Sequence, residues 1–129
     1  MKTFTKNFRI NAELSDVYAA LTNPVTIELW SGYPAVMSEE PGSEFSLWEG
    51  DIEGRNISFE KNRKIVQEWY FGDQSVKSVV TITLKQAGSS STDVNLEHVN
   101  IPDEVYENIV QGWDDYYFGA IQNFFNPNF

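Results

Sequence analysis

The chain has 129 residues, 41% of them hydrophobic and 15% aromatic, which is enough for one compact domain with a substantial core and too little for two ordinary ones. Nine basic and 19 acidic residues give a net charge of −10, which argues against nucleic acid as a partner because its phosphates would be repelled. Cysteine is absent, which excludes disulfides and fits a reducing compartment such as the cytoplasm, and no apolar run approaches the ~20 residues that span a membrane.

The N-terminal part is predicted to form a strand followed by two short helices. Residues 4–10 alternate between apolar and polar side chains, which is typical of a strand with one buried face. In residues 13–22 the apolar positions recur at helical spacing. Asn23 and Pro24 end this helix, and the same pair can cap and start a second one that runs to Trp30.

The middle of the chain is predicted to form an antiparallel meander. Short turns join its strands, and a parallel pair would need a longer crossover. Hairpin turns are expected at residues 49–51 and 61–63, with a further turn at residues 88–91. The expected strands cover about residues 35–38, 44–49, 51–60, 64–72, 76–86 and 92–99.

The last element is predicted to be a long helix that begins at Pro102-Asp103, with Asp103 as its N-cap, and ends at Asn126-Pro127. Its apolar stripe needs a large apolar partner, and the inner face of the sheet is the one on offer, so the fold class is α+β. Gly112 and Gly119 share one side of this helix; they indicate either close approach to a neighbouring element or room for a ligand. The stripe comprises Tyr106, Ile109, Trp113, Tyr117, Ala120 and Phe124, widened by Val110, Tyr116 and Ile121.

Charge is distributed in blocks. Residues 12–54 and 86–129 contain acidic residues and no Lys or Arg. This pattern indicates either a solvated acidic surface or an acidic face that meets a basic partner. Folding of the meander is expected to gather a small basic patch near two hairpin ends, a candidate surface for an acidic partner. The patch would consist of Arg55, Lys61, Arg63 and Lys64.

A series of short motifs resembles one family almost from end to end. Gly50, Ile52, Gly54 and Asn56 resemble its Gly-x-Ile-x-Gly-x-Asn hairpin. The other matching segments are residues 17–22 with Trp30, 64–69, 80–84, 92–94, 98–102, 112–113 and 116–118. In this order and spacing the chain resembles the C-terminal domain of the activator of heat shock protein 90 ATPase, within the START-like superfamily.

The resemblance implies a helix-grip fold over residues 1–129, in which a curved antiparallel sheet of about six to seven strands grips the long C-terminal helix. It implies a co-chaperone that docks on a heat-shock-90-type chaperone, although the eukaryotic activator carries an N-terminal domain for which this chain has no room. Relatives with this fold also suggest two alternatives: a binding protein for a small apolar ligand, and an enzyme resembling polyketide cyclases.

The chemistry-bearing residues favour a protein without catalysis, metal or cofactor. His98 is the single histidine and shares the parity of Leu96 and Val94, which is typical of a core histidine. A triad would need a nucleophile and a carboxylate around it, and no Gly-x-Ser-x-Gly motif occurs. One histidine without cysteine makes a zinc site improbable, no acidic pair has calcium-loop spacing, and no glycine-rich loop precedes a helix.

The space between sheet and helix is the remaining candidate site. Trp69 and Tyr70 are neighbours, so only one can point inward, and the parity of Ile65 and Phe71 favours Trp69. The large rings either line a ligand cavity or simply fill the space. The candidate lining is Trp30, Trp48, Trp69, Tyr70, His98, Trp113 and Tyr117, with Tyr70 the less favoured member of its pair.

Overall fold

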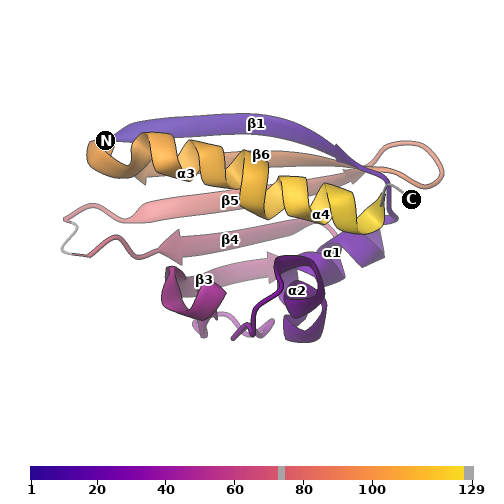
Figure 1. The fold of residues 1–129 in the computed structure, drawn as a ribbon, viewed down its shortest axis with the longest axis horizontal. Helices are drawn as coiled ribbons and strands as arrows, with labels where there is room; N and C mark the ends of the chain where they lie inside the picture. The colour runs from indigo at the N-terminus through magenta and orange to yellow at the C-terminus, as the bar shows by residue number, and fades with distance from the viewer. Residues whose placement is uncertain (73–74, 127–129) are drawn as a thin grey trace.

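The computed structural model describes residues 1–72 and 75–126. An antiparallel sheet of six strands in the order β1-β6-β5-β4-β3-β2 forms one layer, and the helices lie across one of its faces (Figure 1). The α+β prediction is therefore confirmed. The strands are β1 (Lys2–Ile10), β2 (Glu44–Leu47), β3 (Ile52–Glu60), β4 (Lys64–Trp69), β5 (Ser78–Gln86) and β6 (Thr92–Ile101).

Two short helices follow β1, as the sequence predicts. They are α1 (Leu14–Thr22) and α2 (Pro24–Ser31). The Asn23 side-chain oxygen accepts hydrogen bonds from the backbone N–H groups of Val25 at 2.9 Å and Thr26 at 3.2 Å. Asn23 therefore satisfies two donors at the start of α2 that would otherwise have no helical partner.

The strand predicted at residues 35–38 is absent, and the next one is shorter than predicted. Residues 35–38 contribute one isolated bridge, in which Val36 exchanges two backbone hydrogen bonds with Ser46. Pro34 has no N–H to donate, so the pairing cannot extend toward the N-terminus through it. The strand predicted at residues 44–49 ends at Leu47, because the next two residues leave the extended conformation.

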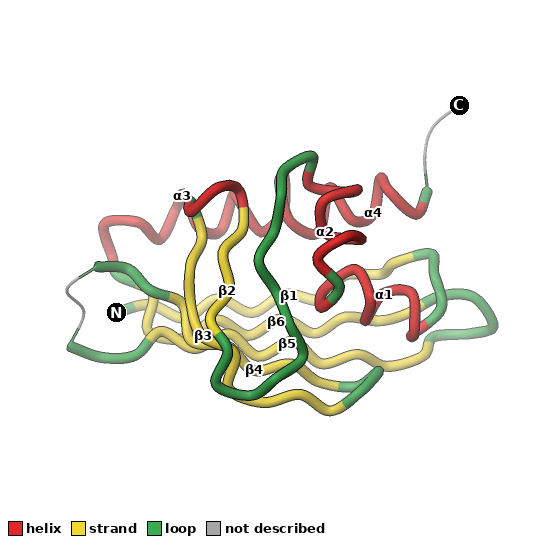
Figure 2. Tube along the Cα trace, turned by 90° about the horizontal axis from the view of Figure 1, so that it is seen from below, coloured by secondary structure: helices red, strands yellow, loops and turns green. Residues whose placement is uncertain are grey.

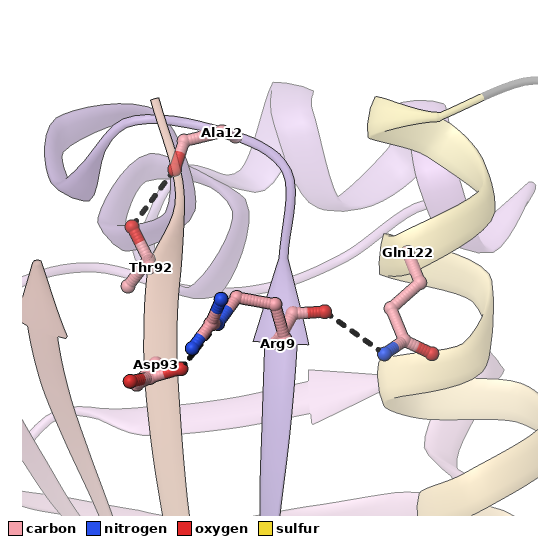
Figure 3. A network of polar contacts seen from close by, with 5 residues as sticks. All are labelled: Arg9, Ala12, Thr92, Asp93 and Gln122. Atoms are coloured by element: carbon pink, nitrogen blue, oxygen red, sulfur yellow. Dashed lines mark hydrogen bonds and ion pairs between the residues drawn. The ribbon is translucent and has the colours of Figure 1, made fainter. Parts of the chain in front are cut away.

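The first strand, β1, forms one edge of the sheet and pairs with the last strand, β6. β1 and β6 pair in antiparallel register from Lys2–Ile101 to Ile10–Thr92. Figure 3 shows the end of this pairing, where the Thr92 hydroxyl donates to the Ala12 carbonyl oxygen at 2.8 Å. There the Arg9 side chain pairs with Asp93, while the Gln122 amide donates to the Arg9 carbonyl oxygen at 3.1 Å. The C-terminal helix thus holds the outer edge of β1.

The C-terminal helical segment is continuous but not uniform. It begins as a 3-10 turn, η2 (Asp103–Val105), and continues as α3 (Tyr106–Gly112), a π-helical turn, η3 (Trp113–Tyr117), and α4 (Phe118–Phe125). Asp103 is not the N-cap, since it is the first residue of the 3-10 turn and Pro102 holds the cap position; its carboxylate lies 2.9 Å from the N-terminal ammonium of Met1. The predicted end at Asn126 is confirmed, and Pro127 lies outside the described residues.

The π-helical turn changes which side chains the segment buries. The Phe118 N–H donates to the carbonyl oxygen of Trp113, five residues earlier, so the turn holds one residue more than an α-helical turn. The stripe shifts accordingly: Phe118 is fully buried, whereas Tyr116 is 67% exposed and Phe124 also reaches solvent. The prediction of the stripe is therefore confirmed for Ile109, Trp113, Tyr117, Ala120 and Ile121, and it is wrong for Tyr116 and Phe124.

The two helix glycines have different causes. A Cβ on Gly119 would lie 2.1 Å from the Asp114 carbonyl oxygen, which the π-helical turn brings close. A Cβ on Gly112 would have no atom within 4 Å. Gly119 is thus required by close approach within its own helix, while Gly112 borders open space.

This contrast predicts opposite effects for one substitution. We expect Gly112→Ala to raise the free energy of unfolding by roughly 0.5–1 kcal/mol, because alanine removes chain entropy without meeting a neighbour. We expect Gly119→Ala to lower it by about 1–3 kcal/mol, because the methyl group meets a backbone carbonyl. Urea unfolding of both variants beside the wild type measures the difference, and equal effects would contradict the assigned causes.

Candidate functional site

A pocket with a volume of about 480 Å³ lies between the C-terminal helical segment, the β2–β3 turn and the loop after α2. Figure 2 shows β2 and β3 rising from the sheet toward the helical layer. Trp48 and Asp51, in the turn between these strands, line one side of the pocket. The volume is in the range of small-molecule sites. The lining residues are Ser31, Tyr33, Trp48, Asp51, Ile52, Trp69, Asn108, Ile109, Gly112, Trp113, Asp115, Tyr116, Tyr117 and Ala120.

The β2–β3 turn presents Trp48 to the pocket in an unusual backbone conformation. The turn η1 (Trp48–Gly50) has three successive positive φ angles, 49° at Trp48, 55° at Glu49 and 98° at Gly50. Positive φ is rare for a bulky residue such as tryptophan and costs on the order of 1–3 kcal/mol. The ring centroid of Trp48 lies 5.9 Å from that of Tyr117 and 5.7 Å from that of Trp30. This aromatic packing stabilises the strained turn.

Gly54 lets β3 pass close to its neighbours below the pocket. A Cβ there would lie 2.0 Å from the Glu68 carbonyl oxygen and 2.7 Å from the Phe45 ring. Any side chain at this position would therefore push apart β4 and the residues of β2. This close approach explains the second glycine of the hairpin motif, Gly54.

A buried chain of amides fixes the orientation of Trp69. The Trp69 indole N–H donates to Gln67 at 3.1 Å, and the Gln67 amide donates to Asn56 at 3.0 Å. Asn56 in turn donates to the Ser43 hydroxyl at 3.1 Å and to the Ser38 carbonyl oxygen at 3.3 Å. The asparagine of the hairpin motif thus connects the loop before β2 with the strand that carries Trp69.

His98 is fully buried on β6, and both of its ring nitrogens have partners. The Trp113 indole N–H donates to Nδ1 at 3.1 Å, and Nε2 lies 2.8 Å from the Ser78 hydroxyl oxygen. An indole N–H can only donate, so Nδ1 is an acceptor and the neutral ring carries its proton on Nε2. His98 therefore donates to Ser78, whose hydroxyl donates to the Val99 carbonyl oxygen at 3.2 Å.

This arrangement does not suit Ser78 and His98 for nucleophilic catalysis. A general base would take the serine proton at Nε2, but that nitrogen already holds a proton. The other nitrogen faces the indole of Trp113, where a triad would place a carboxylate. Burial lowers the pKa of His98 to about 3, so the ring is neutral at pH 7. The contacts are those of a core histidine, as the sequence predicts.

The structure brings four of the predicted cavity residues to the pocket. Trp48, Trp69, Trp113 and Tyr117 line it. Tyr70 points outward and is 42% exposed, so the preference for Trp69 is confirmed.

Trp30 and His98 do not line the pocket. Trp30 lies behind Trp48 and donates its indole N–H to the Ala20 carbonyl oxygen at 2.8 Å. His98 lies behind Trp69 and Trp113, with ring centroids 5.1 and 5.9 Å away. Trp30 and His98 therefore pack behind the aromatic rings that line the pocket and do not reach the pocket themselves.

Sequence reasoning missed the polar rim of the pocket. Asp51 and Asp115 line it beside the exposed aromatic residues Tyr33 and Tyr116. Asp51 is the last residue of the predicted hairpin turn, and Asp115 follows Trp113 by two residues, so their sequence positions contained a signal. Only the π-helical turn and the rising β2–β3 turn bring them to one opening.

The structure does not gather the predicted basic patch. Arg55 lies within β3 opposite Glu44 and Glu68, and its guanidinium is 3.5 Å from the Glu68 carboxylate. At about 3.4 Å per residue, Arg55 is roughly 17 Å from the β3–β4 turn. The prediction is wrong for Arg55, because the strand register places it between carboxylates and away from the other bases.

The other three bases remain together at the β3–β4 turn. Lys61, Arg63 and Lys64 form this basic turn, and Arg63 pairs with Glu60 at 3.3 Å. Exposed pairs of this kind contribute little to stability, typically ~0–1 kcal/mol. The basic turn is a smaller cationic surface than the sequence predicts.

Within residues 1–72 and 75–126, no group of three or more His, Asp or Glu side chains is placed to hold a metal ion. No helix in the same ranges is long and apolar enough to cross a membrane.

Comparison with known proteins identifies the family. Residues 11–126 match the family model described as Activator of Hsp90 ATPase homolog 1-like protein. A Dictyostelium discoideum protein, the activator of 90 kDa heat shock protein ATPase homolog, is 30% identical over 118 residues, covering 87% of this chain and 31% of that protein. The chain spans about a third of the length of the curated relatives that it matches.

Solved structures agree with this match. An HSP90 activator from Plasmodium falciparum superposes with a TM-score of 0.85 at 26% identity, covering 92% of each chain. The Aha1 dimer from Colwellia psychrerythraea gives a TM-score of 0.84 over 98% of each chain; at 14% identity this likeness shows the fold alone. From the family match over residues 11–126, the fold and the hairpin motif, we conclude that the chain belongs to the family of Activator of Hsp90 ATPase homolog 1-like proteins.

Proposed function

We propose that this chain is a non-catalytic module that binds a chaperone of the heat shock protein 90 type and stimulates its ATPase. The family match over residues 11–126 carries the proposal. The relatives from Dictyostelium and Plasmodium are named as activators of that chaperone, and the proposal extends their role to this chain. A module of this kind acts through its surface and needs no reaction centre of its own.

The contacts of His98 support the non-catalytic part of the proposal. Both ring nitrogens are used in buried hydrogen bonds, and the proton sits on the nitrogen that faces Ser78. Burial holds the pKa of the ring at about 3, far from the value of a base that works near pH 7. The pair therefore serves to join β5, β6 and the C-terminal helix.

We expect the basic turn to steer the encounter with an acidic face of the chaperone. Charge reversal of Lys61 and Lys64 to Glu should slow association about tenfold at low salt and much less at high salt, because steering is screened by ions. The readouts are the association rate with the host's own chaperone and the stimulation of its ATPase.

The chain supplies a matched control. Lys2 and Lys77 are exposed at the opposite end of the sheet from the basic turn, and their reversal to Glu changes the net charge equally without touching that turn. If both double variants slow association equally, the basic turn has no local steering effect, and the net charge of the chain alone explains the slower association. A wild-type chain that neither binds nor stimulates the chaperone would refute the proposed function itself.

A second candidate function is the binding of a small ligand in the pocket. The volume of about 480 Å³ and the aromatic walls favour it. Trp48 in its strained turn and the rings of Trp69, Trp113 and Tyr117 would contact such a ligand. This candidate is compatible with chaperone binding, since the pocket and the basic turn involve different residues.

A further inference from the structure

We infer that the pocket between η3, the β2–β3 turn and the loop after α2 binds a small organic cation, an ammonium group attached to an aromatic or branched apolar body. The inference rests on the second candidate function and specifies its ligand class. Three independent observations support it: the sign of the charges at the opening, the chemistry of the walls, and the two irregular backbone turns that frame the opening.

All charged side chains that line the pocket are acidic. Asp51 and Asp115 line it from opposite walls, the β2–β3 turn and the helix, and the Asp115 carboxylate also accepts a hydrogen bond from the Gln111 amide at 3.3 Å. Among the described residues, no Lys, Arg or His belongs to the lining. With a net charge of −10 around it, the opening attracts cations and repels fatty acids, phosphates and other anions. An anionic or strongly polar neutral ligand therefore does not fit this site.

The walls present aromatic faces and edges. Trp48, Trp69, Trp113, Tyr116 and Tyr117 all line the pocket. Aromatic rings attract a cation through the negative charge of their faces, and clusters of such rings are used to recognise ammonium groups that carry alkyl substituents. The same rings bury apolar surface, so the ligand gains most if the charge is attached to an apolar body. An inorganic cation would not use these walls.

Tyr117 supplies one polar group inside the pocket. Its side chain is 3% exposed, and the residue lines the pocket. Burial raises the pKa of Tyr117 well above its usual value, so the hydroxyl stays neutral and can accept a hydrogen bond from an ammonium N–H. The ring of Trp113, tilted by 50° with its centroid 4.6 Å away, packs against the phenol.

The pocket also depends on two departures from regular backbone. The left-handed turn at Trp48 and Glu49 forms one wall, and the π-helical turn that carries Asp115 and Tyr116 forms the other. Both kinds of departure are costly and concentrate at functional sites. Gly112 completes the lining between them without a side chain. A pocket that existed only as a packing gap would not require this combination.

The test uses three probes of similar size that differ in charge: benzylammonium, benzyl alcohol and phenylacetate. Titration of the full chain is followed by tryptophan fluorescence and by calorimetry. We expect benzylammonium to bind at least about tenfold more tightly than benzyl alcohol, and phenylacetate to bind more weakly than either. The preference should decrease as salt is added.

Two pairs of variants locate the effect. Asp51→Asn with Asp115→Asn should weaken the cation about tenfold and leave benzyl alcohol unchanged. The control, Asp16→Asn with Glu97→Gln, removes the same charge outside the pocket and should leave both affinities unchanged. Gly112→Leu should abolish binding of all probes while the chain stays folded, because its side chain enters open space.

Each outcome decides between the proposals. Equal affinity for benzylammonium and benzyl alcohol would overturn the cation inference and leave the pocket as an apolar ligand site. Failure of every probe to bind would overturn both ligand proposals without affecting chaperone binding. Loss of chaperone stimulation in Gly112→Leu, in a chain that binds no cation, would assign the pocket to a contact with the chaperone instead.

Discussion

Replacing Trp113 with alanine is expected to lower the free energy of unfolding by about 3–5 kcal/mol, the range for large aromatic residues in cores. Trp113 is 2% exposed, and its ring stacks on that of Trp69 at 4.7 Å between centroids. Its indole N–H is also the donor that satisfies His98. The substitution therefore leaves a cavity and an unpaired buried nitrogen at once. Chemical unfolding of the wild type and the variant measures the loss.

Two further substitutions separate the causes. Trp113→Phe keeps most of the packing and removes the indole N–H, so a loss of about 1–3 kcal/mol is expected from the unpaired His98 nitrogen. Tyr116→Ala changes a large aromatic side chain on the same helical turn that is mostly exposed, and it should cost less than ~1 kcal/mol. A loss below ~1 kcal/mol for Trp113→Ala would show that this residue does not anchor the helix on the sheet.

Acidification is expected to destabilise the fold through His98. Burial lowers the folded-state pKa to about 3, whereas the unfolded chain has the ordinary value near 6.5. Between these values the unfolded state binds a proton that the folded state does not, so stability decreases as the pH falls. The expected loss is roughly 2 kcal/mol from pH 7 to pH 5 and about 3 kcal/mol by pH 4.

His98→Gln provides the reference for this measurement. The chain has one histidine, so the variant lacks the group that titrates near pH 6.5. The difference between wild type and variant in urea unfolding at pH 7, 5 and 4 cancels the carboxylates common to both. A difference that does not change with pH would show that the folded chain and the unfolded chain have the same His98 pKa, and it would contradict the lowered value. Chaperone stimulation at pH 7 should persist in any folded variant, because the ring performs no chemistry.

The sequence predicts the elements whose causes are local. Asn23 caps α2 with its own side chain, and the alternation around Trp69 determines which ring faces inward. Both depend on neighbouring residues in the chain, so the pattern contains the information. Asp103 shows the limit of such reasoning: it has the residue type of an N-cap, but the N-terminus of β1 lies close enough to take its carboxylate.

The pocket could be predicted only in part, because its form depends on contacts between distant residues. The aromatic lining follows from strand parity and helix spacing, which place Trp69, Trp113 and Tyr117 on inner faces. The π-helical turn adds one residue and thereby moves Asp115 and Tyr116 to the opening. The π-helical turn requires a glycine at position 119, because a Cβ there would meet the Asp114 carbonyl oxygen. The sequence shows this glycine, but its distance along the chain from Asp114 does not by itself predict a π-helical turn.

The pairing of β1 with β6 has a consequence during synthesis. β1 leaves the ribosome before its partner β6, which ends at Ile101, so the strand waits on the order of ten seconds at a rate of ~5–20 residues per second. An exposed strand with two free edges can pair with other chains. Lys2, Lys6 and Arg9 are interspersed with its apolar residues. The charges that later pair on the surface therefore first protect the nascent chain from aggregation.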